Sequence, residues 1–290
     1  MMTEQEIPIP VAHLFARLDT LLIDLLGSLD DEDWSKPTLA GAWTVKDIAA
    51  HLLDTNCRAL AIQRDGYYDI KPPQAALESY SGLVEWLDSL NHEWVQAAKR
   101  LSPRVLVQLL EITGKETSAY YASTDPWVIA PFGVAWAGEE QSYQWMHLAR
   151  EYTEKWHHQQ QIREALGKSK GQPERLMTRE LFYPNIATFM RGLPHTYRSV
   201  EAALETVVEI IIESEAGGTW YLQRGKTAWN LAPEASSSPS ATVTLPPETA
   251  WKLFTRGISQ AEAKQQIRMQ GDETLGMPVL SMLSIMAKPR

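Results

Sequence analysis

The feature that most constrains this chain is a change in the spacing of its apolar residues. From Val11 to about Leu166 they recur three and four positions apart, which is the period of amphipathic helices. Beyond residue 205, short segments instead alternate apolar with polar residues, and Gly, Ser and Pro separate them, as is typical of β-strands. The chain has 290 residues, a length that favours two domains. We therefore expect an all-α N-terminal domain followed by an α+β domain.

Four long helices are predicted in the first domain. A long connection over 102–137, helical only around 105–112, separates the third helix from the fourth, and Gly167 is the expected C-cap of the fourth. Helices of this number and length favour an antiparallel four-helix bundle, whose interior is a natural place for a metal site. The predicted ranges are Val11–Leu29, Thr44–Gln63, Gln74–Leu101 and Gly138–Leu166.

The second domain begins after a polar segment, Gly167–Glu174 (GKSKGQPE), which is the best candidate for a linker. The expected domains are therefore residues 1–168 and 172–290. A helix over 176–193 comes first in the second domain, and helices over 247–256 and 273–286 come last. The predicted strands are Thr206–Ser214, Thr219–Gln223, Thr227–Leu231, Ala241–Leu245 and Ile267–Gln270.

Charge and composition exclude several classes of protein. Lys and Arg together number 27 against 36 Asp and Glu, so no basic excess is available to neutralise phosphates, and we expect no nucleic-acid partner. No apolar run is long enough to span a bilayer, and the first residues, MMTEQEIPIP, lack the pattern of a signal peptide. We therefore expect a cytoplasmic protein without a membrane partner. The sequence says nothing about the oligomeric state.

A single cysteine, Cys57, excludes an intrachain disulfide and any cluster of thiolate ligands from this chain. A bound metal would need His, Asp or Glu ligands. The predicted second helix has a well-defined start, with Thr44 as N-cap, Asp47 as the acid of a capping box and Trp43 placed to pack against Ile48. This start fixes the register of the helix and puts His51 at the edge of its apolar face.

The predicted fourth helix carries a polar stripe beside its packing face. The stripe contains His147, Glu151, Glu154 and His158 at spacings of four, three and four residues. Glu154 and His158 lie one turn apart and could hold one divalent cation, with His51 from the second helix as third ligand. Three such ligands leave a coordination position open, as in catalytic sites. The alternative is a buried, hydrogen-bonded histidine beside ordinary i,i+4 pairs.

Neighbours of this stripe have other expected roles. His157 is rotated by roughly 100° from His158, so both are not expected to face one ion. Gln159, Gln160 and Arg163 are candidates for contacts to the metal ligands or to an anion, with a solvated helix face as the alternative, and Gln159 and Arg163 are the candidate cofactor-binding residues. Cys57 lies about 240° around the second helix from His51 and is not expected to supply a ligand.

Three segments resemble a known family. Gly41–Leu53 (GAWTVKDIAAHLL) and Arg150–Gly167 (REYTEKWHHQQQIREALG) are similar to the two metal-binding segments of the mycothiol-dependent maleylpyruvate isomerases, which belong to the DinB-like metal-binding superfamily. Thr242–Ala287 is similar to the sterol-carrier-like C-terminal domain of that family. The resemblance thus covers most of the chain.

The resemblance implies a DinB-like four-helix bundle in which His51, Glu154 and His158 hold a divalent metal. Zinc is the preferred ion, and nickel and iron are alternatives. Family members use the metal to lower the pKa of a low-molecular-weight thiol, such as mycothiol or bacillithiol, so that its thiolate attacks a small electrophile. The implied enzyme is a thiol-dependent isomerase or S-transferase. The alternative is a non-catalytic protein that binds metal, or a lipid or other small molecule in its C-terminal domain, where 277–286 is expected to form a Met-rich helix.

Overall fold

The computed structural model describes residues 7–287, which form two compact units. The helical unit consists mainly of residues 11–125 and 154–176, and the sheet unit of residues 7–10, 126–153 and 177–286. The division falls between Thr153 and Glu154, inside the long helix α6 (Gln144–Gly171). The domain limits expected from the sequence, at residues 168 and 172, remain a prediction.

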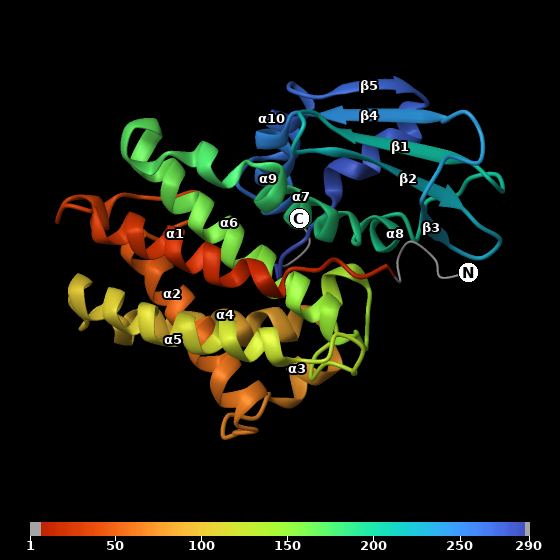
Figure 1. Cartoon of the computed structure of the whole chain (residues 1–290). Helices are drawn as coiled ribbons and strands as arrows, with labels where there is room; N and C mark the ends of the chain where they lie inside the picture. Colours follow the sequence, from red (N-terminus) through yellow and green to blue (C-terminus); the bar gives the residue numbers. More distant parts are fainter. Residues whose placement is uncertain (1–6, 288–290) are drawn as a thin grey trace. The chain divides into compact units, whose positions relative to one another are not determined.

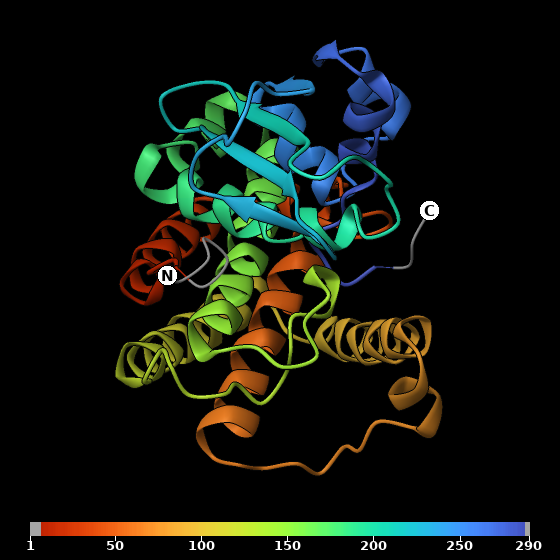
Figure 2. The same cartoon turned by 90° about the vertical axis from the view of Figure 1, so that its right-hand side faces the viewer.

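The helical unit contains five helices besides the second part of α6 (Figure 1). A π-helical turn, Ala59–Arg64, continues the second of them, and an extended segment then leads to the third (Figure 2). Short 3₁₀ turns occupy Ala12–Leu14, Asp33–Ser35 and Pro173–Leu176. The five helices are α1 (Phe15–Gly27), α2 (Val45–Arg58), α3 (Gln74–Glu78), α4 (Tyr80–Ala98) and α5 (Pro103–Ser123).

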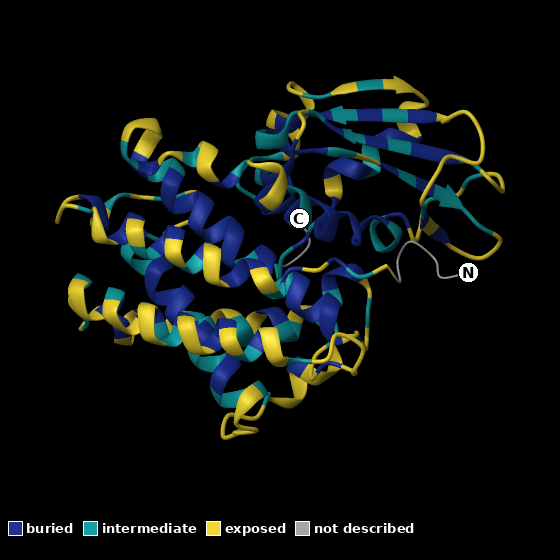
Figure 3. Ribbon diagram, viewed as in Figure 1, coloured by how far each residue is buried: buried dark blue, intermediate teal, exposed yellow. Residues whose placement is uncertain are grey.

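The core of the helical unit is built around α2. Its predicted apolar face is buried and packs with side chains from α1, α4, α5 and the second part of α6. In Figure 3, α2 is buried along most of its length, whereas α5 exposes one side to solvent. The buried residues of α2 in this core are Val45, Ile48, Ala49, Ala50, Leu52 and Leu53.

Helix α5 corrects the prediction of a mostly irregular connection over 102–137. Ser102 caps this helix, Pro103 occupies its first turn, and it continues for 21 residues. Its buried face includes Gly114, Thr117 and Ser118, which are small or polar and therefore hide the apolar period. A Cβ at position 114 would lie 3.0 Å from the Asp19 carboxyl carbon, so the close approach of α1 accounts for the glycine.

Two other helices differ from their predicted limits. The predicted helix over 74–101 is interrupted at Ser79, which has extended φ and ψ and caps α4 by accepting a hydrogen bond from the Gly82 amide. Helix α6 begins at Gln144 rather than 138, because Ser142 pairs with the chain at Ala130. At the other end Gly167 adopts a φ of 73° and interrupts the regular helix, where the sequence predicted a C-cap.

The sheet unit is built on a mixed five-stranded sheet of order β3-β2-β1-β4-β5 (Figure 1). The central strands β1 and β4 run parallel, and the other neighbours are antiparallel. All five strands overlap their predicted ranges. They are β1 (Val207–Ile212), β2 (Gly218–Arg224), β3 (Trp229–Ala232), β4 (Ala241–Leu245) and β5 (Arg268–Gly271).

The helices of the sheet unit are shorter than predicted. The helix expected over 273–286 is wrong, because α11 ends at Gly276 after only four residues (Glu273–Gly276) and is followed by a 3₁₀ turn, Met277–Ser281, that Pro278 opens. The helix expected over 176–193 begins later and is followed by a separate short helix, and α10 was not predicted. Besides the first part of α6, the helices described in this unit are α7 (Arg179–Met190), α8 (Leu193–Thr196), α9 (Pro247–Phe254), α10 (Gln260–Lys264) and α11 (Glu273–Gly276). Within residues 7–287, every helix is too short or too polar to traverse a bilayer.

Candidate metal centre

The start of α2 is fixed by a capping box. The Thr44 hydroxyl accepts a hydrogen bond from the Asp47 amide, and the Asp47 carboxylate accepts one from the Thr44 amide. This reciprocal pair confirms the predicted register. It places His51 two turns into the helix, where the side chain is only 4% exposed.

His51 is a buried polar residue without a hydrogen bond. Neither Nδ1 nor Nε2 has a hydrogen-bond partner, although an orphaned buried polar atom is costly. The Trp43 ring packs against the imidazole with a centroid separation of 5.0 Å, and it also lies 6.0 Å from the His158 ring. A buried imidazole whose two nitrogens both lack hydrogen bonds is suited to bind a cation.

Glu154 and His158 lie one turn apart on α6 and meet His51. The Nε2 atoms of His51 and His158 are each 3.8 Å from the same carboxylate oxygen, Glu154 Oε1. The two imidazole rings are 4.8 Å apart and nearly perpendicular. The structure therefore brings together the three residues singled out in the sequence, and one ligand atom from each lies within 4.8 Å of the others.

The geometry suits a small divalent cation. With bonds of ~2.0–2.2 Å, adjacent ligands of tetrahedral zinc are ~3.4 Å apart, slightly less than the separation of 3.8 Å between each Nε2 and Oε1. The Glu154 side chain is 29% exposed and has room to adjust, whereas the His51 and His158 side chains are 4% and 9% exposed. Two imidazoles and one carboxylate form the donor set of several catalytic zinc sites.

Electrostatics favour the protonation states that a metal requires. Burial lowers the pKa of His51 to about 4, although the Glu154 carboxylate opposes this shift. Burial acts to raise the pKa of Glu154, but the imidazoles of His158 and His51 outweigh it and hold that pKa well below its ordinary value. At neutral pH, His51 is therefore neutral and Glu154 ionised, as metal ligands must be.

The other histidines of α6 and Cys57 of α2 are not part of this group of three. His157 Nδ1 is 3.7 Å from Glu154 Oε2, whereas the Nε2 atoms of the other two histidines pair with Oε1. His147 is buried in the sheet unit, 3.7 Å from Glu151. On α2, burial and then the Asp54 charge raise the pKa of the Cys57 thiol, which disfavours its thiolate.

Gln159 and Arg163 are buried, so the alternative of a solvated helix face is wrong. The Gln159 amide donates to the Leu18 carbonyl. The Arg163 guanidinium donates to the carbonyls of Leu21 and Gly171. Both side chains therefore join α6 to backbone carbonyls of α1. Their role in binding an anionic cofactor stays a prediction.

Gln161 is a residue of the site that the sequence did not single out. Its Oε1 lies 2.8 Å from His158 Nδ1, and its side chain is buried. The signal was present in the spacing, because Glu154, His158 and Gln161 follow one another at four and three residues along one side of α6.

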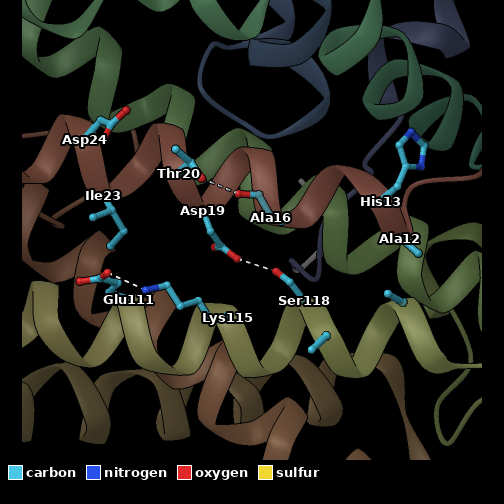
Figure 4. A pocket seen from close by; sticks show the side chains of 12 residues that line it. Ala12, His13, Ala16, Asp19, Thr20, Ile23, Asp24, Glu111, Lys115 and Ser118 are labelled. Atoms are coloured by element: carbon cyan, nitrogen blue, oxygen red, sulfur yellow. Dashed lines mark hydrogen bonds and ion pairs between the residues drawn. The ribbon is translucent and has the colours of Figure 1, made fainter.

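A second polar cluster crosses the helical unit beside the site. Lys155 follows Glu154 on α6 and donates to Asp19 Oδ1 at 2.5 Å and to Asn56 Oδ1 at 3.2 Å. The Ser118 hydroxyl from α5 donates to the other Asp19 oxygen. Figure 4 shows Asp19 and Ser118 among the lining of a groove of about 630 Å³ between α1 and α5. The cluster thus joins α1, α2, α5 and α6.

Comparison with solved structures shows the fold of the chain. A crystal structure of a histidine-to-alanine mutant of the mycothiol-dependent maleylpyruvate isomerase superposes with a TM-score of 0.52 at 12% identity, covering 93% of this chain and 96% of that one. A second crystal structure of the mycothiol-dependent maleylpyruvate isomerase gives a TM-score of 0.50 at 14% identity, covering 87% and 91%. No curated protein matches the sequence.

The family follows from the sequence match. Residues 15–163, just over half of the chain, match the sequence model of the mycothiol maleylpyruvate isomerase N-terminal domain. This range includes His51, Glu154 and His158 together with Gln161. The chain therefore belongs to the mycothiol maleylpyruvate isomerase N-terminal domain family.

Proposed function

We propose that the protein is a metal-dependent enzyme that activates a low-molecular-weight thiol and uses it to isomerise or modify a small electrophile. The observation that carries the proposal is the convergence of His51, Glu154 and His158, with both nitrogens of His51 buried and free of hydrogen bonds. The family match and the similarity to maleylpyruvate isomerase structures support the same reaction class.

These three residues would hold the ion, and zinc is the preferred metal because two imidazoles and a carboxylate suit it. When bound, it would supply a Lewis-acid site that lowers the pKa of a coordinated thiol, so that the thiolate is available near neutral pH. His51 and His158 would each supply one ring nitrogen, and Glu154 would contribute the negative charge. The partial exposure of Glu154, against the burial of both histidines, favours thiol entry beside the carboxylate.

The expected reaction follows from thiol chemistry. A thiolate adds to a conjugated carbon–carbon double bond of the electrophile and leaves an enolate, the former double bond rotates as a single bond, and expulsion of the thiolate restores the double bond in the other geometry. Atoms and charge balance, because the thiolate that adds is the thiolate that leaves. Maleylpyruvate is the substrate to test first, because the similar structures are of maleylpyruvate isomerases.

The finer architecture belongs to the same proposal. We propose that the helical unit is an antiparallel DinB-like four-helix bundle to which α3 and α5 are added. The sheet unit is proposed to be a sterol-carrier-like domain. A cytoplasmic location would give the enzyme access to the thiol pool of the cell. A lipid-carrying role has weaker support, because Met277–Ser281 is a 3₁₀ turn whose Val279 and Leu280 are buried, as is the following Met282.

The test is a turnover assay with the zinc-loaded protein. Maleylpyruvate is incubated with mycothiol, bacillithiol or glutathione, and its cis-to-trans isomerisation is followed by absorbance and by NMR. We expect turnover with at least one thiol and none with Glu154→Gln, which loses the ligand charge. Zinc-loaded protein that is inactive with all three thiols, and neither isomerises maleylpyruvate nor forms a thioether with it, would contradict the proposal.

A further inference from the structure

His158 is held by a hydrogen bond on the side of its ring away from Glu154. The Gln161 Oε1 atom lies 2.8 Å from His158 Nδ1, while His158 Nε2 faces Glu154 Oε1 at 3.8 Å. Gln161 follows His158 by three residues, so the two side chains lie on one side of α6. Both residues are buried, with 3% of Gln161 and 7% of His158 exposed, so water competes little for this bond.

The bond determines which nitrogen carries the proton. A neutral imidazole has one N–H, on either Nδ1 or Nε2, and the other nitrogen has the lone pair. A carboxamide oxygen only accepts, so His158 must donate from Nδ1. The lone pair is then on Nε2, the atom directed at Glu154. The opposite tautomer would put a hydrogen where a metal bond has to form and would leave Gln161 Oε1 without its donor.

His51 provides a contrast in the same site. Its Nδ1 and Nε2 are both without hydrogen-bond partners, so no hydrogen bond selects its tautomer. The Trp43 ring orients the His51 imidazole by packing but makes no hydrogen bond with it.

We propose that Gln161 is a positioning residue that prepares His158 as a ligand: it fixes the Nδ1–H tautomer before any metal arrives, whereas His51 acquires its tautomer only on metal binding. The inference rests on the proposed metal site. It adds one residue that touches neither metal nor substrate but raises metal affinity and the basicity of the ligand, as hydrogen-bonded partners of metal-bound histidines do.

The first test uses the metal-free wild-type protein. Long-range ¹H–¹⁵N correlation spectra distinguish the two imidazole tautomers, and the signals of His158 are assigned by their loss in His158→Gln. We expect His158 to be a single Nδ1–H tautomer, and Gln161→Leu to convert it to a mixture. An Nε2–H tautomer, or a mixture already present in the wild type, would overturn the inference.

The second test measures zinc affinity by competition with a chromophoric chelator. We expect Gln161→Leu to bind zinc ~10–100-fold more weakly, whereas Gln161→Glu, whose carboxylate still accepts from Nδ1–H, binds at least as tightly as the wild type. Gln160→Leu is the matched control, because Gln160 is the adjacent buried glutamine on α6 and its amide makes no hydrogen bond.

The outcomes separate the inference from the proposed function. Equal zinc affinities of Gln161→Leu and Gln160→Leu, with both folded by circular dichroism, would overturn the role of Gln161 and leave the metal site intact. A wild-type protein that binds no zinc would contradict the proposed function, and the tautomer of His158 would then still decide whether Gln161 selects it.

Discussion

The buried Lys155 should be among the most costly residues of the helical unit to replace. The Lys155 side chain is 5% exposed, and that of its partner Asp19 is 14% exposed. In Lys155→Met the apolar stem is kept, but Asp19 loses its counter-ion and retains only the hydrogen bond from Ser118. Removing one partner of a buried ion pair costs ~3–5 kcal/mol. Because Asp19 is partly exposed, we expect a loss near the lower limit, about 3 kcal/mol.

Urea denaturation monitored by far-ultraviolet circular dichroism measures this loss, because most of the signal comes from helices. In the double variant Asp19→Leu/Lys155→Met no unpaired charge remains, so we expect it to be more stable than either single variant. Lys115→Met is the matched control, because Lys115 pairs with Glu111 on the surface, and we expect a change below about 0.5 kcal/mol. Additive losses in the double variant, or a loss from Lys155→Met no larger than that from Lys115→Met, would refute the reasoning.

Three further outcomes follow from the candidate metal centre. Burial lowers the pKa of His51 to about 4 in the metal-free folded protein. As pH falls from ~6.5 to 4, the unfolded chain therefore binds a proton that the folded chain does not, and the free energy of unfolding should drop by on the order of 3 kcal/mol. A pH series of urea denaturations should show a smaller drop for His51→Gln, and an equal drop would contradict this assignment. Trp43→Ala removes the ring that packs on His51 and His158. In competition titrations it should weaken zinc binding more than Trp43→Phe does. Equal weakening would show that the ring has no part in orienting the histidines. His157→Ala should retain zinc at the wild-type content by elemental analysis, and loss of the metal would mean that His157 rather than its neighbour is the ligand.

The three candidate ligands could be found from the sequence because local rules fix their positions. The capping box at Thr44 sets the register of α2 and hence of His51, and the spacing of four residues puts Glu154 and His158 on one side of α6. The meeting of the two helices was expected from an antiparallel bundle, and the family resemblance implied the same ligand set. Spacing alone also left an ordinary packed histidine as an alternative.

Other features could not be predicted because their causes are not local in the sequence. The sequence pattern is that of an arginine on an exposed helix surface at position 163. Arg163 is nevertheless buried, and the carbonyls of Leu21 and Gly171 accept hydrogen bonds from its guanidinium. Only residues 105–112 of α5 were predicted to be helical, because its buried face then contains Gly114 beside Asp19 and Ser118 bonded to the same carboxylate. Helical periodicity is detected from apolar residues, so a helix face built around a buried ion pair does not show it.

The most direct test of the account is the metal content of the protein. Untagged protein, purified without chelator and reconstituted with zinc, is subjected to elemental analysis beside His158→Ala, with circular dichroism to confirm that both are folded. The account predicts about one zinc-like ion per chain in the wild type and none in the variant. Folded wild-type protein without metal after reconstitution, or a variant that retains the full content, would contradict the claim that His51, Glu154 and His158 form a metal site.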